Sequence, residues 1–406
     1  MIKQTNTVIV GGGQAGLAMS AHLRDCGVDH LVIEKDRIAE RWRSARWDSL
    51  VMNGPAWHDR FPTMNFVDWH PDSFPGKEAV ASYFENFAIQ INAPTHCGVE
   101  VLNVTRRQDG GFFVETSMGQ VTAQNIVAAT GPFQTPVIPP IVANENIQQI
   151  HSFDYHNPEQ LNDSAVLVVG AGSSGSQIAD ELLRAGHKVF LSIGPHDRPP
   201  RSYRGKDFVW WLGTLGKWKM ETPPIGKEHV TISVSGAYGG KTVDFRKFAN
   251  RGMVLLGMTE SYESGVINIA GDLVKNIAYG DANYLGLLAE ADEYIKVNNL
   301  DFPLEEEAKI MLPDPDCLAK PIRQIDLKEA GIKTILWATG YKQDFSWLKA
   351  DVFDNHNKPV HKKGVAKVDG IYFLGLPWLT MRGSSFIWGV WEDAKYLAAH
   401  IARSGS

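Results

Sequence analysis

The pattern of apolar and polar positions along the chain repeats itself once at long range. An apolar run at residues 7–10 leads into a glycine-rich turn, a helical stretch and a second apolar run at 31–33. The same order returns at 166–169, again with a turn and a helical stretch, and ends in an apolar run at 189–191. Short apolar runs that alternate with helical segments are typical of parallel strands covered by helices. Each segment therefore predicts half of a dinucleotide-binding fold, and the fold occurs twice.

The stretches outside the two repeats predict how the domains are connected. Apolar residues recur at helical spacing over 80–91, and Asp109-Gly110-Gly111 marks a hairpin turn between two apolar strands. Two copies of Ala-Thr-Gly, at 129–131 and 338–340, each end an apolar strand where the chain must turn tightly. The simplest architecture is an α/β protein with two Rossmann-like domains. The second domain, 160–330, is inserted into the first, which comprises 1–159 and 331–406.

Length, charge and cysteine content narrow the functional class. The chain has 406 residues, enough for about two domains, and a formal charge of −6, which gives no basic footprint for nucleic acid. No apolar run approaches the ~18–20 residues of a membrane span, and the N-terminus lacks the features of a signal peptide. Cys26, Cys97 and Cys317 stand far apart, which predicts neither a metal site nor a redox disulfide. We therefore expect a cytoplasmic protein that binds neither membrane nor nucleic acid; a homodimer is left open.

Both glycine-rich turns have the spacing G-x-G-x-x-G between a strand and a helix. The first glycine permits the turn, the second lets the backbone approach a pyrophosphate, and the third lets helix pack on strand. The helix N-terminus adds partial positive charge. The expected contacts are Gly11, Gly13 and Gly16 in the first copy and Gly170, Gly172 and Gly175 in the second.

The two copies differ in the residues that follow. Glu34 ends the second strand of the first copy, where a carboxylate accepts hydrogen bonds from a ribose diol. The second copy has no acid there, and Arg198 and Arg201 lie just downstream, which suits the extra phosphate of NADPH. Solvated loop charges are the alternative for both arginines. Ser173 and Ser174 either donate to the pyrophosphate or are simply small turn residues.

We call the two glycine-rich, phosphate-binding turns the first and the second cradle. The sequence resembles the class B flavin-dependent monooxygenases in having both cradles, in the opening Gly-Ala-Gly-Ser-Ser-Gly of the second and in Ala-Thr-Gly-Tyr at 338–341. The resemblance runs from Val8 to about Ala402. It implies FAD at the first cradle and NADPH at the second, with the inserted domain also shaping substrate entry. Further FAD contacts are expected where the family's pattern is matched, at Trp42, Thr130, Gly131, Ser384 and Ser385.

Asn53-Gly54-Pro55 resembles a family motif whose asparagine lies beside the flavin, so Asn53 is the catalytic candidate. The alternative is an Asx-turn before Gly54. The family's linker fingerprint is met only in its second half, by His151 and Tyr155. Glu145 and Ile147 replace its Phe and Gly, so the role of His151 stays open between linker and ordinary loop histidine.

The resemblance implies that one oxygen atom of O₂ enters a small organic substrate through a C4a-(hydro)peroxyflavin. Sulfur, nitrogen or an electron-rich aromatic carbon is favoured, in an uncharged or weakly charged molecule. Baeyer–Villiger oxidation of a ketone is one alternative, and a non-enzymatic flavoprotein redox sensor is another. A disulfide reductase would need a vicinal cysteine pair, which this chain lacks.

Overall fold

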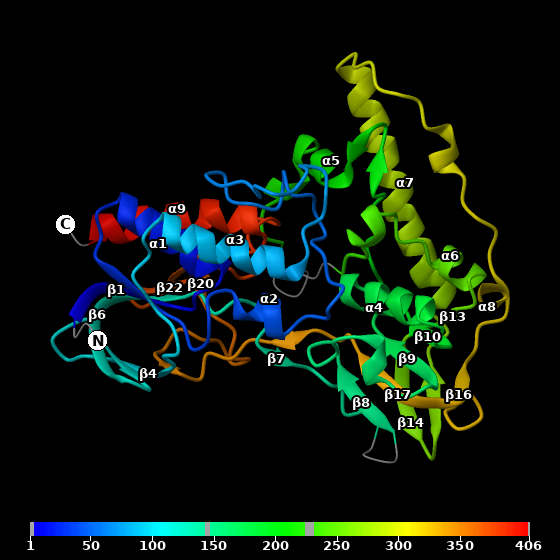
Figure 1. The fold of residues 1–406 in the computed structure, drawn as a ribbon, viewed down its shortest axis with the longest axis horizontal. Coiled ribbons are helices and arrows are strands. Elements are labelled where there is room, and N and C mark those ends of the chain that lie inside the picture. The colour runs from blue at the N-terminus through cyan, green and yellow to red at the C-terminus, as the bar shows by residue number, and fades with distance from the viewer. Residues whose placement is uncertain (1–3, 143–146, 224–230, 405–406) are drawn as a thin grey trace.

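The computed structural model describes residues 4–142, 147–223 and 231–404. The chain forms two bodies that lie side by side, each built on its own sheet, and both chain ends belong to the first body (Figure 1). Two short antiparallel strands, β7 (Thr135–Pro136) and β18 (Tyr341–Lys342), pair between them. Strand β18 directly follows the Ala-Thr-Gly segment at 338–340, and β7 begins a short way after the one at 129–131, so the two passages between the bodies run next to each other.

The first sheet is ordered β19-β4-β5-β6-β1-β2-β3, and β22 adds to it beside β6. Strand β1 lies between β2 and β6 and is parallel to both, which is the arrangement expected of a dinucleotide-binding half. The predicted hairpin is confirmed, because β4 and β5 pair antiparallel. The strands are β1 (Gln4–Val10), β2 (His30–Ile33), β3 (Thr95–His96), β4 (Val101–Arg106), β5 (Phe112–Thr116), β6 (Gly119–Ala128), β19 (Leu348–Lys349), β20 (His361–Lys362), β21 (Val365–Ala366) and β22 (Ile371–Phe373).

Three long helices pack over this sheet: α1 (Gln14–Asp25), α3 (Lys77–Gln90) and α9 (Ile387–Ser404) (Figure 1). The predicted stripe on α3 is confirmed, since Val80, Tyr83, Phe84 and Phe87 are buried in the core that these helices share with the sheet. The short helix α2 (Glu40–Ser44) follows β2. The C-terminal helix α9 thus returns to the N-terminal cradle from the far end of the sequence.

The second sheet is fully parallel, in the order β13-β10-β9-β17-β8. Its strands are β8 (Gln148–His151), β9 (Ala165–Val169), β10 (Val189–Ser192), β13 (Val254–Leu256) and β17 (Ile332–Trp337). Because β8 and β17 belong to this sheet, the expected boundaries at 159/160 and 330/331 leave two of its strands in the other domain. We propose that the second domain instead begins before Gln148 and ends after Trp337.

Helices and small strand pairs surround the second sheet. The helices are α4 (Ser173–Arg184), α5 (Phe208–Thr214), α6 (Phe245–Asn250), α7 (Leu273–Val297) and α8 (Asp316–Ala319). The small strands are β11 (Ser202–Tyr203), β12 (Lys206–Asp207), β14 (Thr259–Glu263), β15 (Val266–Ile269) and β16 (Gln324–Asp326). Helix α7 runs along this body, and the segment that leads from α7 to α8 lies outside it (Figure 1). The irregular part of the insertion lies between α4 and α7, against the junction of the two bodies.

Candidate functional site

The first glycine-rich turn has the geometry of a pyrophosphate cradle. Gly11 has φ of +114°, and a Cβ there would stand 2.6 Å from the carbonyl oxygen of Ala129. A Cβ on Gly16 would stand 1.9 Å from the oxygen of Gly11, so only glycine lets α1 approach β1. Beside Gly13, in contrast, no atom lies within 4 Å of a Cβ position. The open space lies at the N-terminus of α1, where a dinucleotide pyrophosphate is expected.

The second turn repeats this geometry almost atom for atom. Gly170 has φ of +105° and approaches the oxygen of Ala338, and Gly175 approaches the oxygen of Gly170. The Ala-Thr-Gly segments at 129–131 and 338–340 therefore each lie against the first glycine of one cradle. The repeat that the sequence suggested is thus also a repeat of close backbone contacts.

The second cradle is covered more closely than the first. A Cβ on Gly172 would stand 3.3 Å from Cγ2 of Thr231, and the hydroxyl of Ser173 donates to the carbonyl of Ile232 at 2.8 Å. The hydroxyl of Ser233 donates to the carbonyl of Ala171. A bound pyrophosphate would therefore contact the chain at 231–233 as well as the helix N-terminus, where the predicted contact Ser174 lies in the first turn of α4.

Glu34 is held at the edge of the first cradle. Its Oε2 accepts from the backbone N–H of Gly12 at 2.6 Å, and its Oε1 accepts from that of Asp36 at 2.9 Å. The carboxylate is thus fixed at the end of β2, beside the open position at Gly13. This arrangement fits the adenosine half of FAD, whose ribose hydroxyls would donate to Glu34 and whose pyrophosphate would lie over Gly13.

The other expected flavin contacts surround the same cradle. Trp42 is half-buried and packs against the cores of both bodies. The hydroxyl of Thr130 and the carbonyl of Gly131 both accept from the amide of Gln134. The carbonyl of Ser385 accepts from the side chain of Gln14 at 2.9 Å, which joins the loop before α9 to the first turn of α1.

The hydroxyl of Ser384 serves its own loop. It is fully buried and accepts from the backbone N–H of Thr380 and Met381 at 3.0 and 3.1 Å. Asp393 on α9 lies below it, with 2% exposure, and accepts from the hydroxyl of Thr380. Burial raises the pKa of Asp393 to about 6. Ser384 and Asp393 thus fix the conformation of the loop that brings Ser385 to the first cradle.

Asn53 lies at the junction of the two bodies. Its Oδ1 accepts from Nε2 of Gln177 on α4 at 2.8 Å, and its backbone carbonyl accepts from Nη1 of Arg201 at 2.6 Å. Gln177 also donates to the carbonyl of Val234. The second body therefore positions Asn53 from both sides, one turn along α4 from the second cradle.

A histidine–aspartate pair supports the loop that carries Asn53. Asp59 accepts from the backbone N–H of Gly54 at 3.0 Å and from Nδ1 of His58 at 2.6 Å. A Cβ on Gly54 would stand 2.5 Å from the Asp59 carboxylate, so a larger residue at this position would displace the Asp59 side chain. The His58 ring lies among those of Trp218 and Trp388, which brings the start of α9 next to the same loop.

The two arginines expected at the NADPH phosphate have acidic partners inside the protein. Arg198 is 4% exposed and pairs with Asp281 at 2.7 Å. Arg201 is 7% exposed, and its Nη2 lies 2.6 Å from both carboxylate oxygens of Asp207. Neither is the solvated loop charge that was the alternative. Phosphate binding by either stays a prediction, and it would require the guanidinium to leave or share its partly buried carboxylate partner.

His151, at the end of β8, and Tyr155 bind neighbouring segments of the second body. His151 is buried between the N–H of Phe153 and the carbonyl of Gly340, and burial lowers its pKa. The hydroxyl of Tyr155 donates to Glu181 on α4 at 2.7 Å. These contacts favour the linker role over an ordinary loop histidine. Ile147 lies just before β8, and Glu145 lies outside the described residues.

Sequence reasoning missed several residues of this region. Gln177 follows the second cradle in a helical stretch without any motif, and Asp59 and His58 lie in an irregular segment. Only the distance in space between residues 53, 59 and 177 reveals their role, because they are far apart in sequence. Asp393 carried one usable signal, an acid on the apolar side of an amphipathic helix.

Comparisons with known proteins agree with this geometry. The family model for pyridine nucleotide-disulphide oxidoreductases matches residues 8–213. A CzcO-like oxidoreductase of Geobacillus kaustophilus is 32% identical over 401 residues, 98% of each chain. A probable indole-3-pyruvate monooxygenase of Arabidopsis thaliana, YUCCA1, is 31% identical over 416 residues, 97% of this chain and 89% of the relative.

The fold also matches a solved structure. A flavin-containing monooxygenase from Stenotrophomonas maltophilia superposes with a TM-score of 0.68 at 17% identity, covering 100% of both chains. In the part of the chain that the structure describes, no helix is long and apolar enough to cross a membrane. The chain belongs to the pyridine nucleotide-disulphide oxidoreductase family and, within it, to the class B flavin-dependent monooxygenases, enzymes that use a flavin and NADP(H).

Proposed function

We propose that this enzyme uses FAD and NADPH to insert one atom of O₂ into a small organic substrate, at sulfur, nitrogen or an electron-rich aromatic carbon. The observation that carries the proposal is the place of Asn53. It lies on the first body, and Gln177 and Arg201 of the second body bind its side chain and its backbone carbonyl. A residue so placed can serve chemistry that needs both dinucleotides at once.

The chain's own residues would divide the work in the following way. Gly13 and Glu34 would hold the FAD pyrophosphate and ribose, and Gly172 with the first turn of α4 would hold the NADPH pyrophosphate. Asn53 would donate its amide hydrogens toward the flavin ring while Gln177 keeps its Oδ1 occupied. The flavin, when bound, supplies hydride acceptance and O₂ activation, and the protein orients it and excludes water.

The cysteines favour this proposal over the other chemistry in the family's name. A disulfide relay needs two neighbouring thiols at the flavin. Cys26 and Cys97 are exposed, Cys317 is half-buried, and all three are free. The named activity of the plant relatives, oxygenation of indole-3-pyruvate, supports a reaction at a small organic molecule with an aromatic ring.

Isotopic labelling tests the proposal. Under labelled O₂ with NADPH, the product from an accepted sulfide, amine or indole should carry one heavy oxygen atom, seen by mass spectrometry. A product from a cyclic ketone instead would assign the Baeyer–Villiger reaction. Label that ends only in hydrogen peroxide, across the whole panel, would contradict oxygen insertion and leave an NADPH oxidase.

A further inference from the structure

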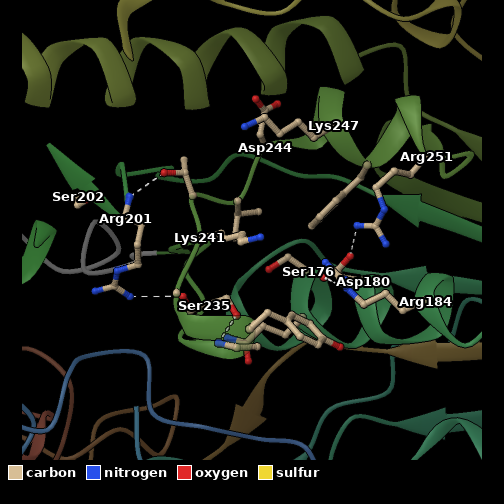
Figure 2. A pocket seen from close by; sticks show the side chains of 17 residues that line it. Ser176, Asp180, Arg184, Arg201, Ser202, Ser235, Lys241, Asp244, Lys247 and Arg251 are labelled. Carbon is tan, nitrogen blue, oxygen red and sulfur yellow. Dashed lines mark hydrogen bonds and ion pairs between the residues drawn. The ribbon is translucent and has the colours of Figure 1, made fainter. Parts of the chain in front are cut away.

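A cavity of about 440 Å³ lies in the second body, between α4, α6 and the chain at 235–244 (Figure 2). This volume lies in the range of small-molecule sites. One wall is the outer face of α4, with Ser176, Gln177, Asp180 and Arg184 at helical spacing. No part of the proposed flavin and pyrophosphate sites uses these side chains, apart from the contact of Gln177 with Asn53.

Arg201, an expected contact of the NADPH phosphate, lines the cavity, which extends along α4 away from the expected site of the pyrophosphate. The pyrophosphate belongs at the N-terminus of α4, beyond the carboxyl end of β9. Arg184 ends this helix, eight residues after Ser176, which corresponds to about 12 Å along the axis. The far end of the cavity thus lies toward the opposite edge of the sheet, where a dinucleotide is not bound in this fold.

Positive charge dominates the lining. Five cationic side chains face two carboxylates, although the whole chain carries a net charge of −6. The cationic residues are Arg184, Arg201, Lys241, Lys247 and Arg251, and Figure 2 shows how they surround the space. A local excess of the sign opposite to the net charge of the chain favours an anionic ligand.

Part of this charge is not neutralised by the protein. Arg184 and Arg251 share the single carboxylate of Asp180. Lys241 and Lys247 are exposed and make no ion pair with the residues that the structure describes. Because the two lysines are unpaired and two arginines share Asp180, the positive charge here can bind at least one more carboxylate or phosphate group.

A buried donor also lacks a partner here. Arg201 lines the cavity, and its Nε is buried without a hydrogen bond to any described residue. The Nε–H itself is covered by protein atoms, and the two Nη groups bind Asp207 and the carbonyls of Asn53 and Ser235. Because Arg201 also binds the Asn53 carbonyl, this wall of the cavity is one side chain away from the proposed oxygenation site.

The remaining wall is apolar. Val243 and Phe248 are buried, and the ring of Tyr238 lies under the guanidinium of Arg184 at 4.0 Å. An inorganic anion would leave these surfaces without a partner, whereas an organic acid would cover them. The lining therefore matches a ligand with one anionic group and an apolar or aromatic body.

We propose that this cavity binds the substrate, and that the substrate is a small organic acid. This inference rests on the proposed function and replaces the uncharged substrate that the sequence favoured. The acid group lies toward Lys241, Lys247 and Arg251, and the body lies along α4 with its reactive end toward Gln177 and Asn53. The positive cluster selects the acid over neutral compounds of the same shape.

Calorimetry on the oxidised holoenzyme tests the site without turnover. Phenylpropionate is the probe, and phenylpropionamide is its uncharged match. The acid should bind at least about tenfold more tightly than the amide, and Lys241→Met/Lys247→Met should remove this preference. Lys275→Met, on α7 outside the cavity, is the matched control and should keep it. Equal binding of acid and amide by the wild type would overturn the proposal.

Further measurements distinguish a substrate acid from the coenzyme phosphate as the bound anion. They also distinguish failure of the anion site from failure of the proposed function. Displacement of phenylpropionate by adenosine 2′,5′-bisphosphate would overturn the proposal, because the lysines would then serve the coenzyme phosphate. Acid binding with no labelled oxygen in any acid tested would contradict the proposed function and leave the anion site. Oxygen insertion that ignores charge and both lysines would overturn the anion site and leave the proposed function.

Discussion

At the scale of single residues, burial separates the polar groups that shape this site from those that are free to act. Ser384 was expected to contact the flavin, and its hydroxyl, like the carboxyl group of Asp393, makes hydrogen bonds within the loop before α9. Asp393 is the more telling of the two, because its Oδ2 has no hydrogen-bond partner among the described residues. A buried carboxylate with an unpaired oxygen favours its protonated form.

Asp393→Asn should therefore stabilise the protein at neutral and higher pH. The pKa of Asp393 in the folded state is raised to about 6. The contribution of protonated Asp393 to the free energy of unfolding is therefore complete below the unfolded-state pKa and is lost as pH rises through about 6. Asparagine keeps the acceptor for Thr380 and does not ionise. Thermal unfolding should show a gain of about 3 kcal/mol at pH 8 that disappears near pH 4. A gain independent of pH would contradict a protonation origin.

At the scale of elements, the strand–turn–helix unit occurs twice with the same contacts but with different surroundings. The position next to Gly13 is open, and that next to Gly172 is closed by Thr231. Matched substitutions in the two turns should therefore have separable effects, provided that each cradle holds its own dinucleotide.

Gly13→Leu should abolish flavin retention, because the side chain would fill the space for the pyrophosphate. Gly172→Leu should keep the flavin and slow its reduction by NADPH at least about 100-fold. The ratio of flavin to protein absorbance and anaerobic stopped-flow spectra measure the two effects. Heat-released cofactor should run as FAD; a flavin that runs as FMN, or is lost equally from both variants, would contradict the assignment of the cradles.

At the scale of the whole molecule, the two bodies meet where the proposed chemistry takes place. Asn53 and Ser49 of the first body contact Gln177 and Glu181 on α4 of the second body. Part of the junction therefore consists of polar contacts to one helix, close to the N-terminus that would hold the coenzyme, and Trp47 and Leu50 add apolar contacts to the core of the second body. Coenzyme binding and the orientation of Asn53 are linked by that helix.

Asn53→Ala should leave flavin reduction by NADPH nearly unchanged and lower the yield of oxygenated product per NADPH. Loss of one preorganised donor typically costs about 10²-fold in the step that it serves. Hydrogen peroxide should rise in proportion, measured beside NADPH consumption. Slowed reduction with unchanged product yield would make Asn53 a turn residue or a nicotinamide contact.

Local patterns in the sequence were sufficient to predict many features of this protein. The two glycine-rich turns, Glu34, the hairpin and the α3 stripe were predicted from periodicity and from the spacing of glycines, which are patterns of neighbouring residues. The contacts that require glycine at positions 11 and 170 are made to Ala129 and Ala338, which are distant in sequence. The prediction that the chain passes between the domains at the repeated Ala-Thr-Gly segments also rests on local features, a strand end and a tight turn.

Only the tertiary structure decided the rest. We propose different domain boundaries because β8 and β17 join the second sheet through pairing partners distant in sequence. Arg198 and Arg201 pair with Asp281 and Asp207, whereas Lys241 and Lys247 make no ion pair with the residues that the structure describes. The sequence around these four cations does not distinguish them. Burial and partners are properties of packing between distant segments, and sequence spacing does not encode them.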